Sequence, residues 1–350
     1  MAAKSDIFHE GTFLQGLCME MCPMRELNLR KKQNRLHPFE KTVENSSPKN
    51  KLNEAMNIAV KEFTRPAAGK ELNPKDIRPA PVLLKTINYL LTVIMKKPSA
   101  LYYKCEFISD RIRSVRQDLT AQNLQNSEAI KILEKATRYY LIMAVRLSQE
   151  PLERYDPVLH NTQLRECLKK LLRLYYIQNT PCKNWTTFLA CDMILNLCTG
   201  SYYLFHEYHK TEVHATKHNG MNLAFDMIKM HAIGNFVGIF RIANTLPFLE
   251  SCAFFNSIER LRSQGLRVMN TAFSSKNLRF PLQLLMEIFC FDSIEATAEF
   301  CTCHNILTQD GNVFFKRGQF MEPSQHKVYT CHKLIGSKTT QSDVDLMIDE

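Results

Sequence analysis

Apolar residues recur at helical spacing along most of the chain, from Leu52 to about residue 275. A spacing of three and four residues places side chains on one face of a helix. Proline and glycine interrupt this pattern repeatedly, which predicts a series of separate helices. We expect helices from 52 to 65, from Pro81 to Pro98, over 100–124, from 126 or 127 to Pro151, after Pro157, from Trp185 to Gly200, and three or more between 202 and 275, with breaks near Asn219-Gly220, Pro247 and Gly265.

The chain from Pro281 onward follows a different pattern. Asp292 and Glu295 have the spacing of a capping box, in which an N-cap acceptor and a carboxylate three residues on bond each other's backbone N–H groups. The expected elements are, in order, a helix over 293–303, a turn at 309–312, a strand at 313–315, a tight turn at Arg317-Gly318 and a strand at 319–321. Two helices followed by a two-stranded hairpin is the order of a winged helix.

The predicted fold class is mainly α: helical hairpins that stack as a repeat-like bundle or solenoid and end in a small winged-helix domain. The expected division is an N-terminal segment with a linker at 1–50, a helical region at 51–278, the winged helix at 279–335 and a tail at 336–350. The tail lacks a core pattern and ends in acidic residues, so we expect it to be mobile.

Composition adds a preference for anionic partners. In 350 residues, Lys+Arg (45) exceeds Asp+Glu (35), which gives a net charge of +10 and favours nucleic acid or an acidic protein surface. The start has no apolar leader, and the stretch from Ile87 to Met95 is far shorter than the roughly 20 residues that span a bilayer, so we expect an intracellular protein without membrane spans. Most of the 12 cysteines lie in apolar helical stretches, so we expect them reduced.

Candidate catalytic and metal chemistry is weak. The chain has no Gly-rich phosphate loop, no nucleophile elbow and no paired-His zinc motif, so we predict neither an enzyme nor a cofactor. Three residues separate Cys18 from Cys22, with too few further ligands nearby for zinc, and a packed loop is the expected alternative. A second group of soft ligands comprises Cys301, Cys303, His304, His326, Cys331 and His332. There we expect a protein core and no metal.

The candidate nucleic-acid site is the predicted hairpin. Lys316 and Arg317 stand at its expected tip, Lys327 and Lys333 follow it, and Lys276 and Arg279 precede the domain. Such side chains contact phosphates in a sequence-independent, salt-sensitive way. The alternative is that Phe314 and Phe320 are core residues and the lysines only solubilise the surface. The basic run from Arg30 to Arg35 is a further, weaker candidate for nucleic-acid contact or nuclear import.

A charged helical segment is the second candidate. Its residues are Asp110, Arg111, Arg113, Arg116 and Asp118. On a helix they form either a solvated ladder of ion pairs or an arginine face for a phosphate or an acidic partner.

Four blocks together resemble the homology region of the Sac-three/GANP family. They are Gly11–Pro23 with Arg25-Glu26, Ala59–Gly69, Asp76–Leu83 with Tyr89-Leu90, and Asp110–Leu119. The residues that carry the family motif are Gly11, Cys18, Met21, Cys22, Pro23, Arg25, Glu26, Arg78 and Pro79. The likeness runs from about Gly11 to Phe320, and the chain is most similar to a short animal member of the family.

The resemblance implies a TPR-like helical superhelix that ends in a PCI-type winged helix. It also implies a non-enzymatic scaffold in nuclear mRNA export, of the transcription-and-export complex two type. Such a scaffold pairs with a second PCI-domain protein and a small acidic subunit, and a basic surface binds single-stranded RNA. The alternative that it implies is a factor in centrosome duplication, spindle assembly and mitotic progression that works through centrosomal proteins. The expected locations are the nucleus and cytoplasm for the first role and the centrosome or spindle for the second.

Overall fold

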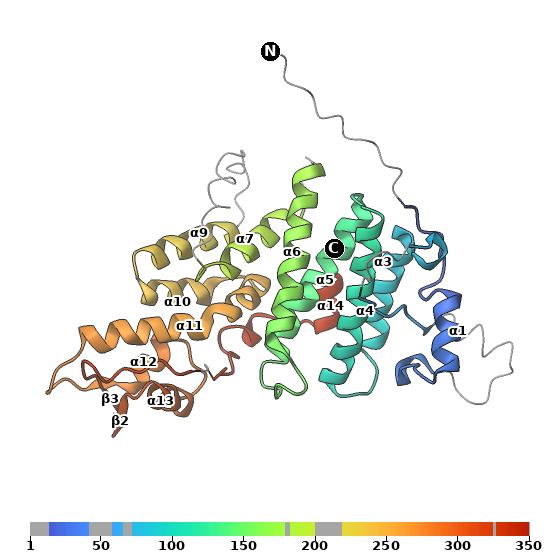
Figure 1. Cartoon of the computed structure of the whole chain (residues 1–350). Coiled ribbons are helices and arrows are strands. Elements are labelled where there is room, and N and C mark those ends of the chain that lie inside the picture. The colour runs from blue at the N-terminus through green and yellow to red at the C-terminus, as the bar shows by residue number, and fades with distance from the viewer. Residues whose placement is uncertain are drawn as a thin grey trace, which may run out of the picture. The chain divides into compact units, whose positions relative to one another are not determined.

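The computed structural model describes residues 14–41, 58–65, 72–178, 183–199, 219–324 and 327–349. In these ranges the chain is mainly helical, with one small three-stranded sheet near the C-terminus (Figure 1), which confirms the predicted fold class. None of the described helices is both long and apolar enough to cross a membrane. The chain divides into two compact units, Met1–Ala136 with Ile348–Glu350, and Thr137–Met347.

The first unit is built from helices that pack beside one another. Its elements are α1 (Met24–Lys32), 3-10 turns at Pro38–Glu40 and Pro74–Asp76, α3 (Ala80–Tyr89), a π-helical turn (Leu90–Ile94), α4 (Leu101–Ala121) and the first part of α5 (Ser127–Arg146). Helix α3 packs against α4 through buried aliphatic side chains such as Leu83 and Ile112. Pro79 stands at the N-cap of α3, where the missing N–H of a proline costs no helical hydrogen bond.

The second unit is a stack of helices that leads into the sheet. Its helices are the rest of α5, α6 (Pro157–Gln178), α7 (Trp185–Leu195), α9 (Asn219–Ala232), α10 (Phe236–Thr245), α11 (Phe248–Ala272), α12 (Leu282–Ile288), α13 (Ile294–Cys303) and α14 (Asp343–Ile348). Helix α7 packs on α6, α9 and α11, and α10 packs on α9 and α11. Figure 1 shows α9, α10 and α11 as successive layers of this stack.

Residues 59–65 are not helical, although their apolar spacing predicted a helix; residues 42–57 lie outside the described ranges. The segment is extended, and acceptors from elsewhere in the first unit take its backbone N–H groups. For residues 60 to 63 in order, these acceptors are Glu40 Oε1 (3.0 Å), Met21 O (3.0 Å), Glu26 Oε1 (2.8 Å) and Asp110 Oδ2 (3.2 Å). These tertiary hydrogen bonds replace the local ones of a helix.

The expected break at Gly265 is also absent, because α11 runs through it. A Cβ atom built on Gly265 would lie 2.8 Å from Cε1 of Phe289, closer than real side chains approach. The glycine therefore gives the Phe289 ring room to pack directly on the helix backbone. It does not end the helix.

The C-terminal sheet differs in register from the prediction. Its strands are β1 (Phe280–Pro281), β2 (Leu307–Gln309) and β3 (Asn312–Phe314), in the order β1-β3-β2. The hairpin turns at Asp310-Gly311, where both residues have positive φ as a two-residue type I′ turn requires. A tight turn does occur at Arg317-Gly318, since the N–H of Gln319 donates to Lys316 O, but no strand follows it. Lys316 and Arg317 are therefore not at the hairpin tip.

The N-cap of α13 is Ser293, one residue later than the predicted capping box places it. Ser293 Oγ accepts a hydrogen bond from the N–H of Ala296 at 3.2 Å. The Asp292 carboxylate instead accepts from the backbone N–H groups of His332 and Lys333, at 2.7 and 2.8 Å. Asp292 thus fixes the backbone at residues 332–333. Its spacing to Glu295 had suggested a capping role instead.

The C-terminal residues, predicted to be a mobile acidic tail, are folded. Lys338 Nζ donates to Ala243 O at 2.7 Å, Leu246 O at 2.9 Å and Ser251 Oγ at 2.7 Å. This ammonium lies at the C-terminal end of α10, where carbonyl groups lack helical partners. The acidic Asp343 pairs with Arg146 of α5 at 2.8 Å. Helix α14 buries Val344, Leu346 and Met347, too short a run for a pattern argument to detect.

We predict that Gly265→Ala destabilises the protein. In an exposed helix this change stabilises by about 0.5–1 kcal/mol, but crowding against Phe289 should reverse the sign and cost about 1–3 kcal/mol. Denaturant unfolding measures the difference. A stabilised variant would show that Phe289 has room to move away.

We predict that Lys338→Met destabilises the protein by about 1–3 kcal/mol, because three buried acceptors lose their donor. Amide hydrogen exchange in residues 339–349 should accelerate. Lys333→Met is the matched control, since the Lys333 side chain is exposed and should tolerate the change. Equal exchange in both variants would contradict the role assigned to Lys338.

Candidate functional site

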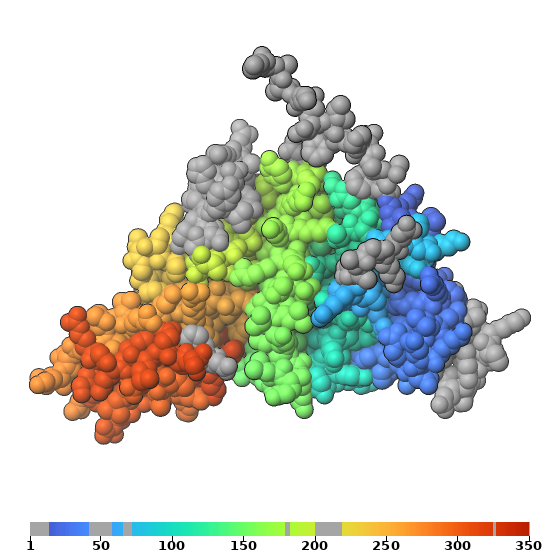
Figure 2. All heavy atoms as spheres, in the orientation of Figure 1, coloured from blue at the N-terminus to red at the C-terminus, as the bar shows by residue number. Residues whose placement is uncertain are grey.

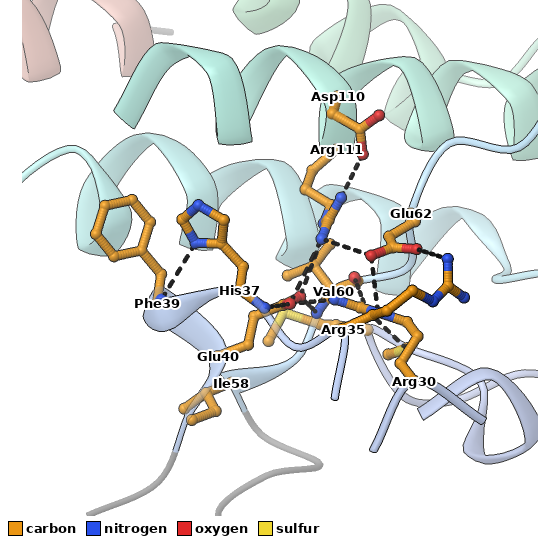
Figure 3. Close-up of polar contacts among 12 residues, drawn as sticks. Arg30, Arg35, His37, Phe39, Glu40, Ile58, Val60, Glu62, Asp110 and Arg111 are labelled. Carbon is orange, nitrogen blue, oxygen red and sulfur yellow. Dashed lines mark hydrogen bonds and ion pairs between the residues drawn. The ribbon is translucent and has the colours of Figure 1, made fainter. Parts of the chain in front are cut away.

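Glu40 is fully buried in the first unit and is surrounded by hydrogen-bond donors (Figure 3). Its carboxylate forms an ion pair with Arg30 of α1 and lies 3.4 Å from the guanidinium of Arg111 of α4. It also accepts hydrogen bonds from the backbone N–H groups of His37, at 3.1 Å, and Val60, at 3.0 Å. A buried carboxylate is tolerated when it is both paired and hydrogen-bonded, and Glu40 meets both conditions.

Glu62 and Asp110 extend this network (Figure 3). Glu62 Oε1 lies 2.9 Å from Nε of Arg30 and 3.6 Å from the guanidinium of Arg111, and Arg35 approaches the other oxygen at 3.8 Å. Asp110 forms an ion pair with Arg111. Together with Glu26, which lies 3.7 Å from Arg30, three arginines and four carboxylates thus form one ion-pair network.

A second buried centre forms around Asp118, near the C-terminal end of α4. Arg78 Nε and Lys61 Nζ each lie 2.7 Å from one of its carboxylate oxygens. Arg78 also donates to Ser114 Oγ at 2.8 Å and to Met21 O at 3.2 Å. All three N–H-bearing nitrogens of this guanidinium are therefore satisfied, and they join the start of α3, helix α4 and the N-terminal motif.

The residues that carry the family motif are mostly structural. Cys18, Met21, Cys22 and Pro23 are buried, while Gly11 lies outside the described residues. Burial, and to a lesser extent the nearby Glu26 carboxylate, raises the pKa of the Cys22 thiol to about 12. Burial likewise raises the pKa of Cys18. Both thiols stay protonated at neutral pH, which suits packing and not metal binding or nucleophilic chemistry.

The remaining motif residues lie at helix N-caps or contact the two buried centres, apart from Arg25. Pro23 and Pro79 stand at the N-caps of α1 and α3, and Arg78 is fully buried. Glu26 accepts the backbone N–H of Glu62, whereas the Arg25 side chain points into solvent.

The charged segment of α4 forms neither a solvated ladder of ion pairs nor an exposed arginine face, the two alternatives that the sequence left open. Arg111 and Asp118 are buried in the two centres, and Asp110 holds the N–H of Phe63. The Arg113 guanidinium lies over the Phe63 ring, 3.9 Å from its centroid. Arg116 is half-buried on the same helix. These side chains hold the unit together, so the segment offers no free arginine face.

Four of the six candidate nucleic-acid residues come together at one edge of the C-terminal module. Asn270 of α11 exchanges two hydrogen bonds with the backbone of Lys316, at 3.1 and 3.2 Å, and Ser274 Oγ accepts the N–H of Arg317 at 2.8 Å. These bonds fix residues 316–317 against the connection that carries Lys276 and Arg279. In the described part of the chain, none of the four exposed side chains forms an ion pair. We call Lys276, Arg279, Lys316 and Arg317 the basic edge.

Lys327 and Lys333 do not join the basic edge. Lys327 Nζ lies 2.5 Å from the Glu299 carboxylate of α13, which neutralises it. The backbone N–H of Lys333 is held by Asp292, on the segment that follows the sheet. The structure therefore separates these two residues from the four that lie together.

The predicted group of soft ligands near Cys301 is dispersed. Cys301 is fully buried, Cys303 is exposed, and burial raises the pKa of Cys301 to about 12. His304 bonds the backbone oxygen of Phe300 at 2.8 Å and Ser263 Oγ at 2.9 Å. His326 lies outside the described residues. Among the residues described, no three His, Cys, Asp or Glu side chains are grouped so that they could hold a metal ion.

Several residues that build these sites were not singled out from the sequence. In the buried centres they are Glu40, Lys61, Glu62 and Ser114, and at the basic edge they are Asn270 and Ser274; Arg30 was considered only as part of the basic run. The burial of Arg30 also rules out the basic run 30–35 as a continuous exposed stretch in the folded protein. The one local signal was the spacing of His37 and Glu40 around Pro38, which forms a capping box.

Comparison with known proteins bears out the family resemblance that the four sequence blocks indicated. A family model described as the SAC3/GANP family matches residues 21–310. SAC3 family protein 1 of Schizosaccharomyces pombe is 26% identical over 325 residues, which cover 87% of this chain and 31% of that protein. Protein xmas of Drosophila melanogaster is 25% identical over 94% of this chain and 16% of its own length. Protein THP3 of Saccharomyces cerevisiae is 23% identical over 67% of this chain. The chain thus spans less than a third of the first two relatives.

We predict that Arg78→Met destabilises the protein by about 3–5 kcal/mol, because Asp118 then loses a buried partner. Arg25→Met is the matched control in the same unit. Arg25 lies 4.0 Å from Asp76 with 82% of its side chain exposed, so its loss should change the free energy of unfolding by less than about 0.5 kcal/mol. Chemical denaturation compares the two variants. Similar effects would show that the Asp118 centre is not what holds the unit.

Proposed function

The chain belongs to the SAC3/GANP family, and we propose that it is a non-enzymatic scaffold in nuclear mRNA export that binds single-stranded RNA at its basic edge. The observation that carries this proposal is the gathering of Lys276, Arg279, Lys316 and Arg317 on one rigid edge, without carboxylates to neutralise them. Cations held close together bind a chain of phosphates and release its counterions.

The backbone geometry supports phosphate contact at this edge. The Asn270 and Ser274 side chains hold residues 316 and 317 by their main chain, so both cationic side chains remain available. Arg279 directly precedes β1, and Phe280 pairs with Val313 of β3. The sheet and the end of α11 therefore position all four cations before RNA arrives, which lowers the ordering cost of binding.

The charge of α13 favours single-stranded RNA over duplex DNA. We infer that the module is a winged helix, because α12, α13 and the β2–β3 hairpin follow one another in that order. In helix-turn-helix readers the second helix enters the major groove. Here α13 carries no Lys or Arg and exposes Glu295, which phosphates would repel, while its Glu299 is paired with Lys327. Contacts from the basic edge alone suit a flexible single strand.

An aromatic side chain at the basic edge can add base stacking. Phe273 ends α11 beside Ser274, and its ring packs against Phe280 and Phe315 at centroid distances of 5.3 and 6.2 Å. It is nevertheless partly exposed. Aromatic platforms next to cations are the usual means of binding single strands without sequence preference.

The proposal extends to partners and location. By resemblance to its family, the chain pairs with a second PCI-domain protein and a small acidic subunit, and it works in the nucleus and cytoplasm. Affinity purification of the tagged protein tests this assembly. Recovery of a PCI-domain protein supports the export role, and recovery of centrosomal proteins alone, with location at spindle poles, would favour the mitotic alternative.

We predict that replacing the four basic-edge residues by Ala weakens binding to single-stranded RNA and makes it less salt-dependent. Each lost phosphate contact should lower the slope of log affinity against log salt by about 0.7. The quadruple variant should therefore lose a slope of roughly 2–3. Fluorescence anisotropy with a labelled oligouridine at several salt concentrations measures both quantities.

Lys327→Ala with Lys333→Ala is the matched control, because these lysines lie apart from the basic edge and Lys327 is already paired. An unchanged slope in the quadruple variant, or an equal loss in the control, would remove the basic edge from the proposal. In cells that lack the protein, wild type and control should restore export of polyadenylated RNA, and the quadruple variant should not.

A further inference from the structure

Two large apolar side chains of the N-terminal motif point outward. Residues 14–19 form no helix, and burial alternates along the backbone from residue 16 to residue 19. Gly16 and Cys18 are buried, whereas Leu17 is 58% exposed and Met19 is 69% exposed; a bend at residues 20–22 follows, and Met21 within it is buried. Leu17 and Met19 thus share one face, and that face is turned away from the core.

The backbone under these side chains is held firmly. Leu17 N–H donates to Pro74 O at 2.8 Å, and Cys18 N–H donates to Ile77 O at 2.9 Å. Gly16 leaves no space for a Cβ, which would lie 2.7 Å from both Gln122 Oε1 and Ile77 O. Because the backbone cannot turn without breaking these contacts, Leu17 and Met19 are presented in a fixed position.

Neighbouring residues enlarge this apolar surface. The bond from Leu17 to Pro74 places residues 72–75 alongside, where Leu72 is 56% exposed. The contact of Arg25 with Asp76 brings the start of α1 to the same place. Figure 2 shows residues 14–41, in dark blue, forming part of the surface of the first unit. Exposed apolar clusters with a polar rim are typical of interaction sites.

Positive charge predominates around this surface. Within residues 14–41 and 72–76, the exposed charged side chains are all cations, namely Arg25, Lys32, Arg35, Lys41 and Lys75, whereas Glu20, Glu26 and Asp76 are half-buried. The carboxylates of Glu26 and Glu40 are turned inward, where they accept backbone N–H groups and face Arg30. The buried network therefore removes negative charge from the surface and leaves the cations outside.

We propose that Leu17, Met19 and Leu72, with Arg25 and Lys75, form a docking face for an acidic peptide segment with apolar side chains, contributed by another protein. Apolar pockets and positive charge are both complementary to such a segment. RNA is a poorer fit, because no aromatic side chain of residues 14–41 or 72–76 is exposed for base stacking. This docking face belongs to the first unit and the basic edge to the second, and the inference does not depend on the proposed function.

Labelled synthetic 16-residue peptides test the docking face. One peptide alternates Leu with Glu, a second replaces Glu by Gln, and a third replaces Leu by Ser. The full-length protein should bind the first peptide at least tenfold more tightly than the other two. Binding of the first peptide should weaken as salt is raised, since exposed charge pairs are screened.

Substitutions test which residues of the protein bind the first peptide. Leu17→Ser with Met19→Ser, and separately Arg25→Glu with Lys75→Glu, should each weaken binding of the first peptide about tenfold or more. Leu152→Ser with Val158→Ser is the matched control, because these apolar residues of the second unit are 68% and 74% exposed. Binding of oligouridine should stay unchanged in all three variants.

Three binding results would overturn the proposal, and so would one stability result. The binding results are absence of binding to the first peptide, equal binding to all three peptides, and equal loss in the Leu152/Val158 control. The stability result is a loss of more than about 1 kcal/mol of stability in Leu17→Ser with Met19→Ser, since exposed substitutions seldom cost that much. That loss would show that another part of this chain already covers the face.

Discussion

The burial of two carboxylates, Glu40 and Asp118, is the constraint on which the first unit depends. A charge removed from water must be compensated by charge and by hydrogen bonds, and residues distant in sequence supply most of these donors here. Arg30, Arg111 and the N–H of Val60 converge on Glu40, while Arg78 and Lys61 converge on Asp118. The N-terminal motif, the extended segment and α4 are thereby fixed to one another, although little regular hydrogen bonding joins them.

This constraint explains which parts of the fold could be predicted. Helices such as α4 and α6 follow from apolar periodicity alone, because their hydrogen bonds are local and their buried face repeats every three to four residues. Residues 59–63 have the same periodicity but donate to distant acceptors, so a local pattern predicted a helix that is absent. Gly265 shows the converse, since a packing partner 24 positions away, Phe289, decides what the glycine does.

The sequence indicated which kinds of residue form the candidate site, but not where in the fold they lie. Basic residues near the sheet were recognisable, but the register of the sheet depends on β1, which is only Phe280–Pro281 and too short for any pattern to reveal. Because β2 pairs with β3 around the turn at Asp310-Gly311, and β1 pairs with the other side of β3, Lys316 and Arg317 lie not at a hairpin tip but at an edge shared with Lys276 and Arg279. Lys327 could not be excluded from sequence, because its partner Glu299 stands on a different element.

The same constraint helps to explain how the net charge of +10 is distributed over the surface. Where carboxylates are drawn inward, as around Glu26 and Glu40, or paired away, as at Glu299, the remaining cations face solvent as groups. Two such groups arise, and their neighbours differ. The basic edge has a partly exposed ring, Phe273, which suits nucleic-acid bases, whereas Arg25 and Lys75 stand beside Leu17 and Met19, which suit apolar side chains. The apolar neighbours, and not the charge, therefore distinguish the proposed RNA-binding surface from the proposed protein-binding one.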